Sequence, residues 1–395
     1  MKKQTSAVFR GTHAGKSVAV AMFLCGLRGV VPHLADPHGE VAMVTEPALV
    51  SIPFVDAVSS KHHPLEIAIP WYDANLRTEY AVGAAPVGVI FDGTNIWVVN
   101  RGSANVTKLL ARDGSNLGAF AVGSGPQFVA FDGANIWVTN TSSNNVTKLR
   151  ASDGSNLGTF AVGSRPAGVT FDGADIWIGN EESANVTKLR ASDGSNLGTF
   201  PVGASPHGLA FDGTNIWVTN EGSNTVTKLR ASDGSNLGTF AAGRAPNGLA
   251  FDGTNIWVGN EASANVTKLR ASDGSNLGTF PVETTPHGLV FDGTNIWVAN
   301  EGSNTVTKLA ANDGSSLGTF AVGSKPHGVA FDGAYIWVAN TSSNNVTKLR
   351  ASDGPETHLG TFFRRNQPSR AALDGPHSRV ANGAWHTSGT PPERN

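Results

Sequence analysis

Residues 201–240 read PVGASPHGLAFDGTNIWVTNEGSNTVTKLRASDGSNLGTF, and this unit recurs almost unchanged along the 395-residue chain. Seven tryptophans mark the recurrence at intervals of forty residues: Trp97, Trp137, Trp177, Trp217, Trp257, Trp297 and Trp337. A fixed period of this length is typical of a repeat architecture. The fold therefore depends on the structure of one unit and on how neighbouring units stack.

Each unit contains four short segments with the composition of β-strands. In the unit quoted above they are residues 207–211, 215–220, 225–230 and 237–242. Val, Ile, Trp, Phe and Thr dominate these segments, as they do on half-buried pleated surfaces. Asp212-Gly213 and Asp233-Gly234 separate them, and Asp-Gly between apolar runs is a hairpin signal. No stretch of the unit has a helical period.

Seven such units predict an all-β fold, a seven-bladed β-propeller of four-stranded antiparallel blades around a central channel. A closed ring protects the sheet edges that an open array would expose. Residues 73–80 resemble the last strand of a unit, so we expect them to pair with the final blade and close the ring. Pro368, Asp374 and Gly375 keep the repeat spacing without the tryptophan, which leaves eight blades as the alternative.

The chain is expected to have three parts. Residues 1–72 form a weakly ordered targeting segment and linker, residues 73–362 the propeller, and residues 363–395 a decayed eighth repeat and tail. An apolar run over residues 17–27 follows several basic residues, as in the core of an export signal. It is shorter than the roughly 20 apolar residues of a transmembrane helix. We expect export to the periplasm or the extracellular space, with the cytoplasm as the alternative.

The composition excludes several functional classes. Charged residues make up 15% of the chain, the net charge is −2, and no basic stripe is present. We therefore expect no nucleic-acid partner. Cys25 is the only cysteine, so the chain has neither a disulfide framework nor a cysteine metal site. We expect the ring to be a monomer.

The differences between units gather on one face. Antiparallel topology places both Asp-Gly turns of a unit on the same face, and these turns barely change. On the opposite face, the position after the proline of each unit reads Val87, Gln127, Ala167, His207, Asn247, His287 and His327. The position after the second strand reads Arg101, Thr141, Glu181, Glu221, Glu261, Glu301 and Thr341. Duplicated copies start identical, so divergence on one face indicates a site there.

We predict a binding site at the channel mouth on this face. It is made of His207, Glu221, Asn247, Glu261, His287, Glu301 and His327. Imidazole and carboxylate groups together can hold a divalent metal such as Mg²⁺ or act as acid and base. The predicted metal ligands are the two same-blade pairs, His207 with Glu221 and His287 with Glu301. The alternative is neutral drift on a solvated rim, and no residue is assigned a catalytic role.

Two other repeated residues are expected to be structural. The tryptophan, flanked by Ile and Val within a strand, should pack between blades with a partner for its indole N–H. The lysines of the third strands are expected to form a solvated face balanced by acidic residues elsewhere. These lysines are Lys108, Lys148, Lys188, Lys228, Lys268, Lys308 and Lys348.

The stretch FDGTNIWVTNEGSNTVTKL at residues 211–229 resembles the YVTN-type β-propeller repeats of bacterial proteins. It is also similar to the repeats of the streptogramin (virginiamycin B) lyase-like superfamily. For lyases of that group the resemblance implies seven blades and a divalent metal, with His and Glu near one channel mouth. This chain has Ile-Trp-Val-x-Asn where those repeats favour Trp-Phe-x-Glu, so the resemblance indicates fold more strongly than activity.

The first functional hypothesis is a non-enzymatic scaffold that binds a protein or a small ligand at the variable face. Near-identity of the units favours it, because an enzyme needs a localised asymmetric site. The alternative is a metal-dependent lyase of the streptogramin lyase type, with His207, Glu221, His287, Glu301 and His327 as candidate residues. A hydrolase such as a lactonase is a third hypothesis.

Overall fold

The computed structural model describes residues 9–13, 16–20 and 77–352. The chain separates into two compact units, residues 1–62 and 63–395, which we describe separately. In the first, β1 (Phe9–His13) and β2 (Lys16–Val20) form a two-stranded antiparallel sheet. Most of the predicted targeting segment and all of the decayed eighth repeat lie outside the described residues. Within the described ranges, no helix has the length and apolar character needed to span a membrane.

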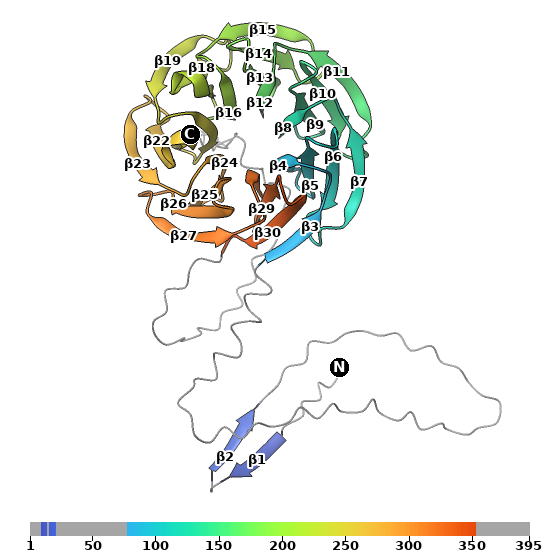
Figure 1. The fold of residues 1–395 in the computed structure, drawn as a ribbon, viewed down its shortest axis with the longest axis vertical. Helices are drawn as coiled ribbons and strands as arrows, with labels where there is room; N and C mark the ends of the chain where they lie inside the picture. Colours follow the sequence, from blue (N-terminus) through green and yellow to red (C-terminus); the bar gives the residue numbers. More distant parts are fainter. Residues whose placement is uncertain (1–8, 14–15, 21–76, 353–395) are drawn as a thin grey trace, which may run out of the picture. The chain divides into compact units, whose positions relative to one another are not determined.

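The second unit is a ring of seven four-stranded antiparallel blades around a central channel (Figure 1). The seven blades confirm the predicted fold. We number the blades along the chain and give their strands from the channel outwards. Blade 1 has β4 (Pro86–Phe91), β5 (Asn95–Asn100), β6 (Asn105–Leu110) and β7 (Asn116–Ala121). Blade 2 has β8 (Pro126–Phe131), β9 (Asn135–Asn140), β10 (Asn145–Arg150) and β11 (Asn156–Ala161). Blade 3 has β12 (Pro166–Phe171), β13 (Asp175–Asn180), β14 (Asn185–Arg190) and β15 (Asn196–Pro201).

The next three blades repeat this plan. Blade 4 has β16 (Pro206–Phe211), β17 (Asn215–Asn220), β18 (Thr225–Arg230) and β19 (Asn236–Ala241). Blade 5 has β20 (Pro246–Phe251), β21 (Asn255–Asn260), β22 (Asn265–Arg270) and β23 (Asn276–Pro281). Blade 6 has β24 (Pro286–Phe291), β25 (Asn295–Asn300), β26 (Thr305–Ala310) and β27 (Ser316–Ala321). Two 3₁₀ turns, η1 (Glu221–Ser223) and η2 (Glu261–Ser263), follow the second strands of blades 4 and 5.

Blade 7 closes the ring with strands from both ends of the described repeats. It has β28 (Pro326–Phe331), β29 (Tyr335–Asn340), β30 (Asn345–Arg350) and β3 (Arg77–Ala81). β3 pairs antiparallel with β30, which confirms the predicted closing strand. Tyr80 of β3 stacks on Trp337 at 5.5 Å between ring centroids. In blade 1 the same contact is made by Phe120 on Trp97, so the closing strand reproduces the packing of an ordinary fourth strand.

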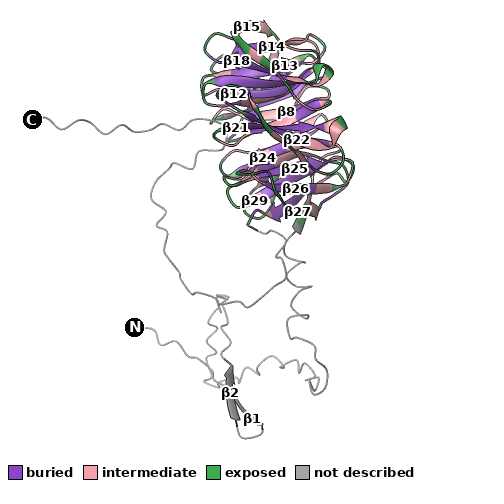
Figure 2. Ribbon diagram, turned by 90° about the vertical axis from the view of Figure 1, so that its left-hand side faces the viewer, coloured by how far each residue is buried: buried purple, intermediate pink, exposed green. Residues whose placement is uncertain are grey.

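The hydrophobic core lies between adjacent blades. Figure 2 shows the buried residues along the strands of the blades. Trp97 of blade 1, for example, packs in one cluster with Ile136 and Val138 of blade 2, and all three are fully buried. Burying a large apolar side chain contributes about 1.5–3 kcal/mol. Because every blade repeats this contact with its neighbour, stability is distributed around the ring.

The first Asp-Gly turn supplies the partner that the buried indole needs. Asp92 Oδ2 accepts a hydrogen bond of 2.7 Å from Trp97 Nε1. Asp92 Oδ1 accepts from the backbone N–H groups of Thr94 and Asn95, so one carboxylate fixes both the turn and the tryptophan. All seven blades contain the equivalent Trp–Asp bond. The prediction that the tryptophans pack between blades is confirmed.

The repeated lysines do not form a solvated face, and that prediction was wrong. Lys108 pairs with Trp97 across β5 and β6, and its side chain is buried along the indole with Nζ 5.0 Å from the ring centroid. The ammonium donates to the backbone carbonyls of Ala151 and Ser152 in the next blade, at 2.7 and 3.1 Å. Lys348 makes the same bridge from blade 7 to Ala111 of blade 1. The lysines therefore connect blades around the whole ring.

Candidate functional site

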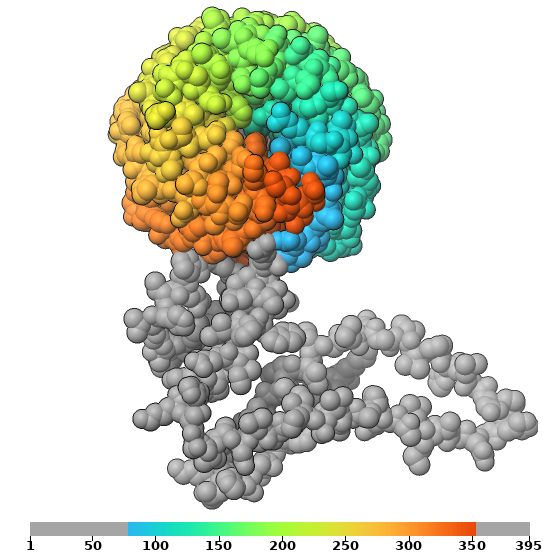
Figure 3. Space-filling view, in the orientation of Figure 1, coloured from blue at the N-terminus to red at the C-terminus, as the bar shows by residue number. Residues whose placement is uncertain are grey.

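A cavity of about 440 Å³ occupies one end of the central channel, a volume within the usual range for small-molecule sites. Figure 3 shows the hollow at the centre of the ring. We call this cavity the mouth. Its lining residues are Ala85, Val87, Arg101, Gln127, Arg165, Glu181, His207, Glu221, Asn247, Glu261, His287, Glu301, His327 and Thr341. All seven predicted binding residues are among them, so the structure places the predicted set around one cavity.

Local backbone structure explains why two distant positions of a unit meet at the mouth. The first variable residue is the second residue of the innermost strand, as His207 is in β16. The second follows the last residue of the second strand, which is the fully buried Asn220 in blade 4. The backbone N–H of Glu221 donates to the carbonyl of Ser205 at 2.9 Å and ties this turn to the start of β16.

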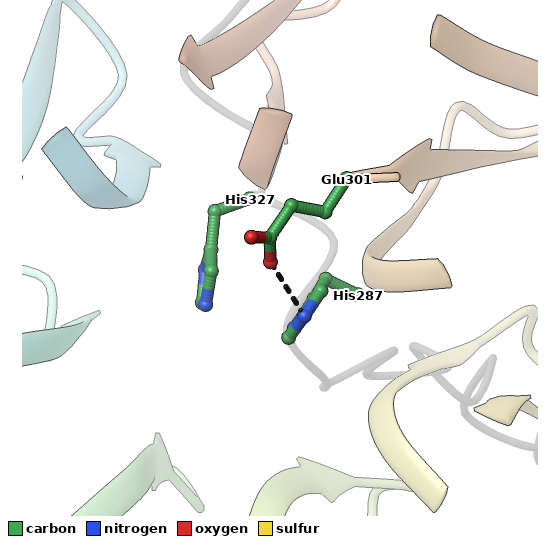
Figure 4. A group of neighbouring side chains, drawn as sticks. All are labelled: His287, Glu301 and His327. Carbon is green, nitrogen blue, oxygen red and sulfur yellow. Dashed lines mark ion pairs between the residues drawn. The ribbon is translucent and has the colours of Figure 1, made fainter. Parts of the chain in front are cut away.

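Three of the predicted residues form a compact group (Figure 4). His287 Nε2 donates to Glu301 Oε2 at 2.8 Å, and the His287 ring stacks on the His327 ring at 4.5 Å between centroids. One ligand atom from each of His287, Glu301 and His327 lies within 4.8 Å of the other two. Imidazole and carboxylate donors at these separations suit a divalent transition metal or Mg²⁺. His327 was predicted as a binding residue but not as a metal ligand, because its own blade has Thr341 instead of a glutamate.

The pair of His207 and Glu221 is arranged differently. Among the described residues, no hydrogen bond or ion pair joins the two side chains, and neither belongs to the compact group. The His207 ring instead lies 3.4 Å from the side-chain amide of Gln127 and packs edge-on against Phe128 at 5.1 Å. Thr141 Oγ1 donates to Gln127 Oε1 at 2.9 Å and holds that amide in place.

Burial keeps the imidazoles of His207 and His327 neutral. Desolvation, assisted by the nearby His287 and Arg165, lowers the pKa of His207 to about 3. Burial also holds the pKa of His327 well below its ordinary value, with smaller contributions from the neighbouring histidines. The Nδ1 atoms of His207 and His287 are buried without a hydrogen-bond partner. Neutral imidazole is the form that binds metals and accepts protons.

The carboxylates of the mouth differ from one another. The hydrogen bond from His287 lowers the pKa of Glu301. Burial raises the pKa of Glu221, and repulsion by Glu261 and Glu181 adds to that effect. Asn247 Nδ2 donates to Glu261 Oε2 at 3.3 Å. Acidic groups in one cavity with opposite pKa shifts, here Glu221 and Glu301, can take up and release protons at different pH values.

Sequence reasoning missed two basic residues of this region. Arg165 approaches Glu181 at 3.4 Å and Lys325 approaches Glu301 at 3.9 Å. Both precede the proline of an innermost strand and have left-handed φ values of 52° and 54°. This is a third variable position, which reads Ala85, Gly125, Arg165, Ser205, Ala245, Thr285 and Lys325. Aligning the units column by column would have revealed it.

A third missed residue, Phe128, lies in the channel next to the mouth. The adjoining cavity of about 140 Å³ is lined by a glycine from every other blade at the corresponding position. A side chain on Gly168, for instance, would collide with the carbonyl of His207. Phe128 replaces this glycine in blade 2, and its ring contacts His207 of blade 4 and His327 of blade 7, at 5.1 and 6.2 Å. One aromatic ring in the adjoining cavity thus contacts two histidines that line the mouth.

Comparison with known proteins identifies the fold. No family model matches the chain, and no curated protein matches it. Hydrazine synthase of Kuenenia stuttgartiensis is similar in structure, with a TM-score of 0.61, 19% identity, and coverage of 68% of this chain and 96% of that one. A streptogramin B lyase structure has a TM-score of 0.60, 19% identity and coverage of 69% and 97%. Virginiamycin B lyase from Staphylococcus aureus has a TM-score of 0.60, 18% identity and coverage of 69% and 98%. These similarities establish a shared β-propeller fold.

Proposed function

We propose that the protein is a binding scaffold whose ligand site is the mouth. The observation that carries the proposal is the distribution of differences between the repeats. Residues that connect the blades are the same in nearly every unit, whereas the residues lining the mouth change from blade to blade. Kinship with YVTN-type repeat proteins and export from the cytoplasm belong to the same proposal. The ligand is a small molecule or a segment of a partner protein.

A screen for ligands that stabilise the folded ring tests this proposal. A compound that binds only the native state raises the melting temperature by mass action. We expect such compounds to stabilise the natural protein and to have little effect on the double variant Glu221→Gln, Glu261→Gln. The control is Arg112→Gln, which alters an exposed residue of the second Asp-Gly turn of blade 1. Ligands that act equally on the natural protein and the mouth variant would contradict the proposed site.

The second candidate function is that of a metal-dependent lyase of the streptogramin lyase type. The compact group of His287, Glu301 and His327 supports it, because its donor set fits a divalent metal such as Mg²⁺. A metal bound there would polarise an oxygen of the substrate. Around it, Glu301 would provide a carboxylate ligand, and His287 and His327 would provide imidazole ligands.

Metal content distinguishes the two functions. Elemental analysis of protein purified without chelator, followed by calorimetric titration of Mg²⁺, Mn²⁺ and Zn²⁺, measures stoichiometry and affinity. One metal per chain that is lost in His287→Ala and Glu301→Gln, but kept in the control Glu181→Gln, would favour the lyase. Affinity no tighter than about 1 mM, or about −4 kcal/mol, would leave the scaffold.

A further inference from the structure

Four glutamates follow one another around the mouth, one from each of blades 3 to 6. They are Glu181, Glu221, Glu261 and Glu301. Basic groups neutralise both ends of this acidic arc. Arg165 approaches Glu181 at 3.4 Å, while His287 and Lys325 approach Glu301 at 2.8 and 3.9 Å.

In the middle of the arc, Glu221 has no such partner and Glu261 shares one. The structure records no hydrogen bond or ion pair from the Glu221 side chain to any described residue, and the adjacent blades place Glu181 and Glu261 on either side of it. Glu261 accepts one hydrogen bond from the neutral Asn247, and its one ion pair among the described residues is with His287, which lies at 3.8 Å and is already bound to Glu301. Uncompensated negative charge therefore concentrates at blades 4 and 5.

Arg101 of blade 1 carries the opposite charge at the opposite side of the mouth. In a ring of seven, blades 4 and 5 are the two that lie three steps from blade 1, and thus face it across the channel. Blades 2 and 7 have the uncharged Thr141 and Thr341 at the position of Arg101. No described residue forms an ion pair with Arg101 within 4.0 Å. The mouth is thus polarised, with an available guanidinium facing two available carboxylates.

Independent evidence for a ligand comes from the histidines. The side chain of His207 is only 6% exposed and lines the mouth, yet its Nδ1 has no hydrogen-bond partner. The same holds for His287, a residue that is 8% exposed and whose Nδ1 also has no hydrogen-bond partner. Buried polar atoms in proteins are nearly always paired, so two unpaired imidazole nitrogens in residues that line the mouth point to a bound water or ligand there.

We infer that the mouth binds a zwitterionic ligand, a molecule that carries a protonated amine at one end and a carboxylate at the other. The ammonium group lies between Glu221 and Glu261, and the carboxylate pairs with Arg101, because guanidinium recognises carboxylate with two parallel hydrogen bonds. A short peptide with free termini has this chemistry, and the cavity of about 440 Å³ can hold one. This inference rests on the proposed function, since it names the ligand class of that site.

Oligoglycines of one to four residues test the inference, because they vary the distance between the two charges without adding side chains. Calorimetric titration in the presence of EDTA measures their affinity without a contribution from metals. We expect affinity to peak at the length that spans the mouth. Acetylating the amine or amidating the carboxylate of that peptide should weaken binding about tenfold or more, as expected for loss of a charged hydrogen bond.

Matched variants assign each end of the peptide to its residue. Arg101→Gln should weaken binding of the free peptide about tenfold but leave the affinity of its C-terminal amide unchanged. Glu221→Gln should weaken the free peptide and leave the N-acetyl peptide unchanged. The control variant Arg112→Gln, on the opposite face, should bind every peptide as the natural protein does.

The results separate this inference from the proposed function. Equal binding of free and capped peptides, or equal weakening of both by Arg101→Gln, would overturn the zwitterion assignment. If no oligoglycine binds but Mn²⁺ or a screened compound binds and is lost in the Glu221→Gln, Glu261→Gln variant, the mouth is a site for another ligand class. If no probe binds at the mouth, both proposals fail.

Discussion

The two faces of the propeller differ in how much each blade resembles the next. On the Asp-Gly face, every blade repeats the same set of contacts, in which an aspartate binds the indole and a lysine bridges to the following blade. On the mouth face, positions that are equivalent in the repeat contain Val87, His207 or Asn247. The Asp-Gly face therefore repeats the same contacts in every blade, whereas the residues that line the mouth differ from blade to blade.

This difference indicates that the Asp-Gly face stabilises the fold and that the mouth face binds a ligand. A repeated contact contributes to stability at every blade interface, so its residues are constrained in every copy. A ligand touches the ring at one place only, and a site for it requires the blades to differ. Substitutions on the Asp-Gly face should therefore change folding stability, whereas substitutions at the mouth should change binding with little effect on folding.

The largest effect is expected from Trp217→Ala in blade 4. Trp217 is fully buried, and its Nε1 donates to Asp212 Oδ2 at 2.8 Å. Truncation of a buried aromatic side chain typically lowers the free energy of unfolding by about 3–5 kcal/mol, which urea denaturation would measure. The control in the same blade is His207→Ala, which introduces the residue that blade 3 already has as Ala167. It should change stability by less than about 1 kcal/mol, and equal losses would contradict the contrast between faces.

A second test compares two lysines. Lys228→Met keeps the apolar stem but removes the ammonium that donates to the carbonyls of Ala271 and Ser272, at 2.7 and 3.2 Å. Loss of hydrogen bonds from a charged group should destabilise the ring by about 1.5–3 kcal/mol. Lys325→Met at the mouth removes a side chain that is 60% exposed and should cost less than about 0.5 kcal/mol. Equal free energies of unfolding for the two variants in urea denaturation would show that the lysine bridge does not stabilise the ring.

The burial of these lysines could not be predicted from the sequence. The period of the tryptophans and the Asp-Gly turns predicted the seven blades, and the strand-like residues before Ala81 predicted the closing strand. The lysines were assigned to solvent because a charged side chain in a polar-looking strand is usually exposed. Only the register that pairs Trp217 with Lys228 shows that the stem lies along the indole and that the ammonium reaches the next blade.

For the mouth, the sequence predicted which residues line the cavity but not how their side chains pair. Topology alone placed both variable positions on one face, so membership of the cavity could be predicted. The pairing of side chains could not, because it depends on which blades face each other across the channel. His287 binds Glu301 of its own blade, but His207 turns towards Gln127, two blades away.

The third prediction concerns pH and the mouth histidines. Burial lowers the pKa of His207 to about 3 in the folded ring, whereas a histidine in the unfolded chain takes up a proton near pH 6.5. Between these values the unfolded state binds more protons, so stability is lost as the pH falls below about 6.5. The loss from His207 alone should be about 2 kcal/mol at pH 5.

The variant His207→Gln isolates this contribution. Glutamine is present at the equivalent position of blade 2 as Gln127, so the repeat tolerates it. Urea denaturation between pH 7 and pH 5 should give a shallower loss of stability for the variant than for the natural protein. His327, whose pKa is also depressed, should account for much of the remaining slope. Identical pH profiles would show that His207 has the same pKa in the folded ring as in the unfolded chain.

Apart from the control variants, the smallest effect on stability, about 1 kcal/mol, is expected from Phe128→Gly, since Phe128 is only partly buried. The variant restores the glycine that all other units have at this position. Removing the ring should admit water beside His207, which it contacts edge-on, and should raise the pKa of that imidazole towards its ordinary value. NMR titration of the His207 ring measures the change, and Phe128→Leu, which keeps an apolar side chain there, should leave the pKa low. If both variants titrate like the natural protein, the aromatic ring does not keep water from the histidine. If the pKa of His207 rises only in the glycine variant, a substitution in blade 2 controls the protonation of a residue in blade 4. The residues that differ between blades are then coupled across the channel.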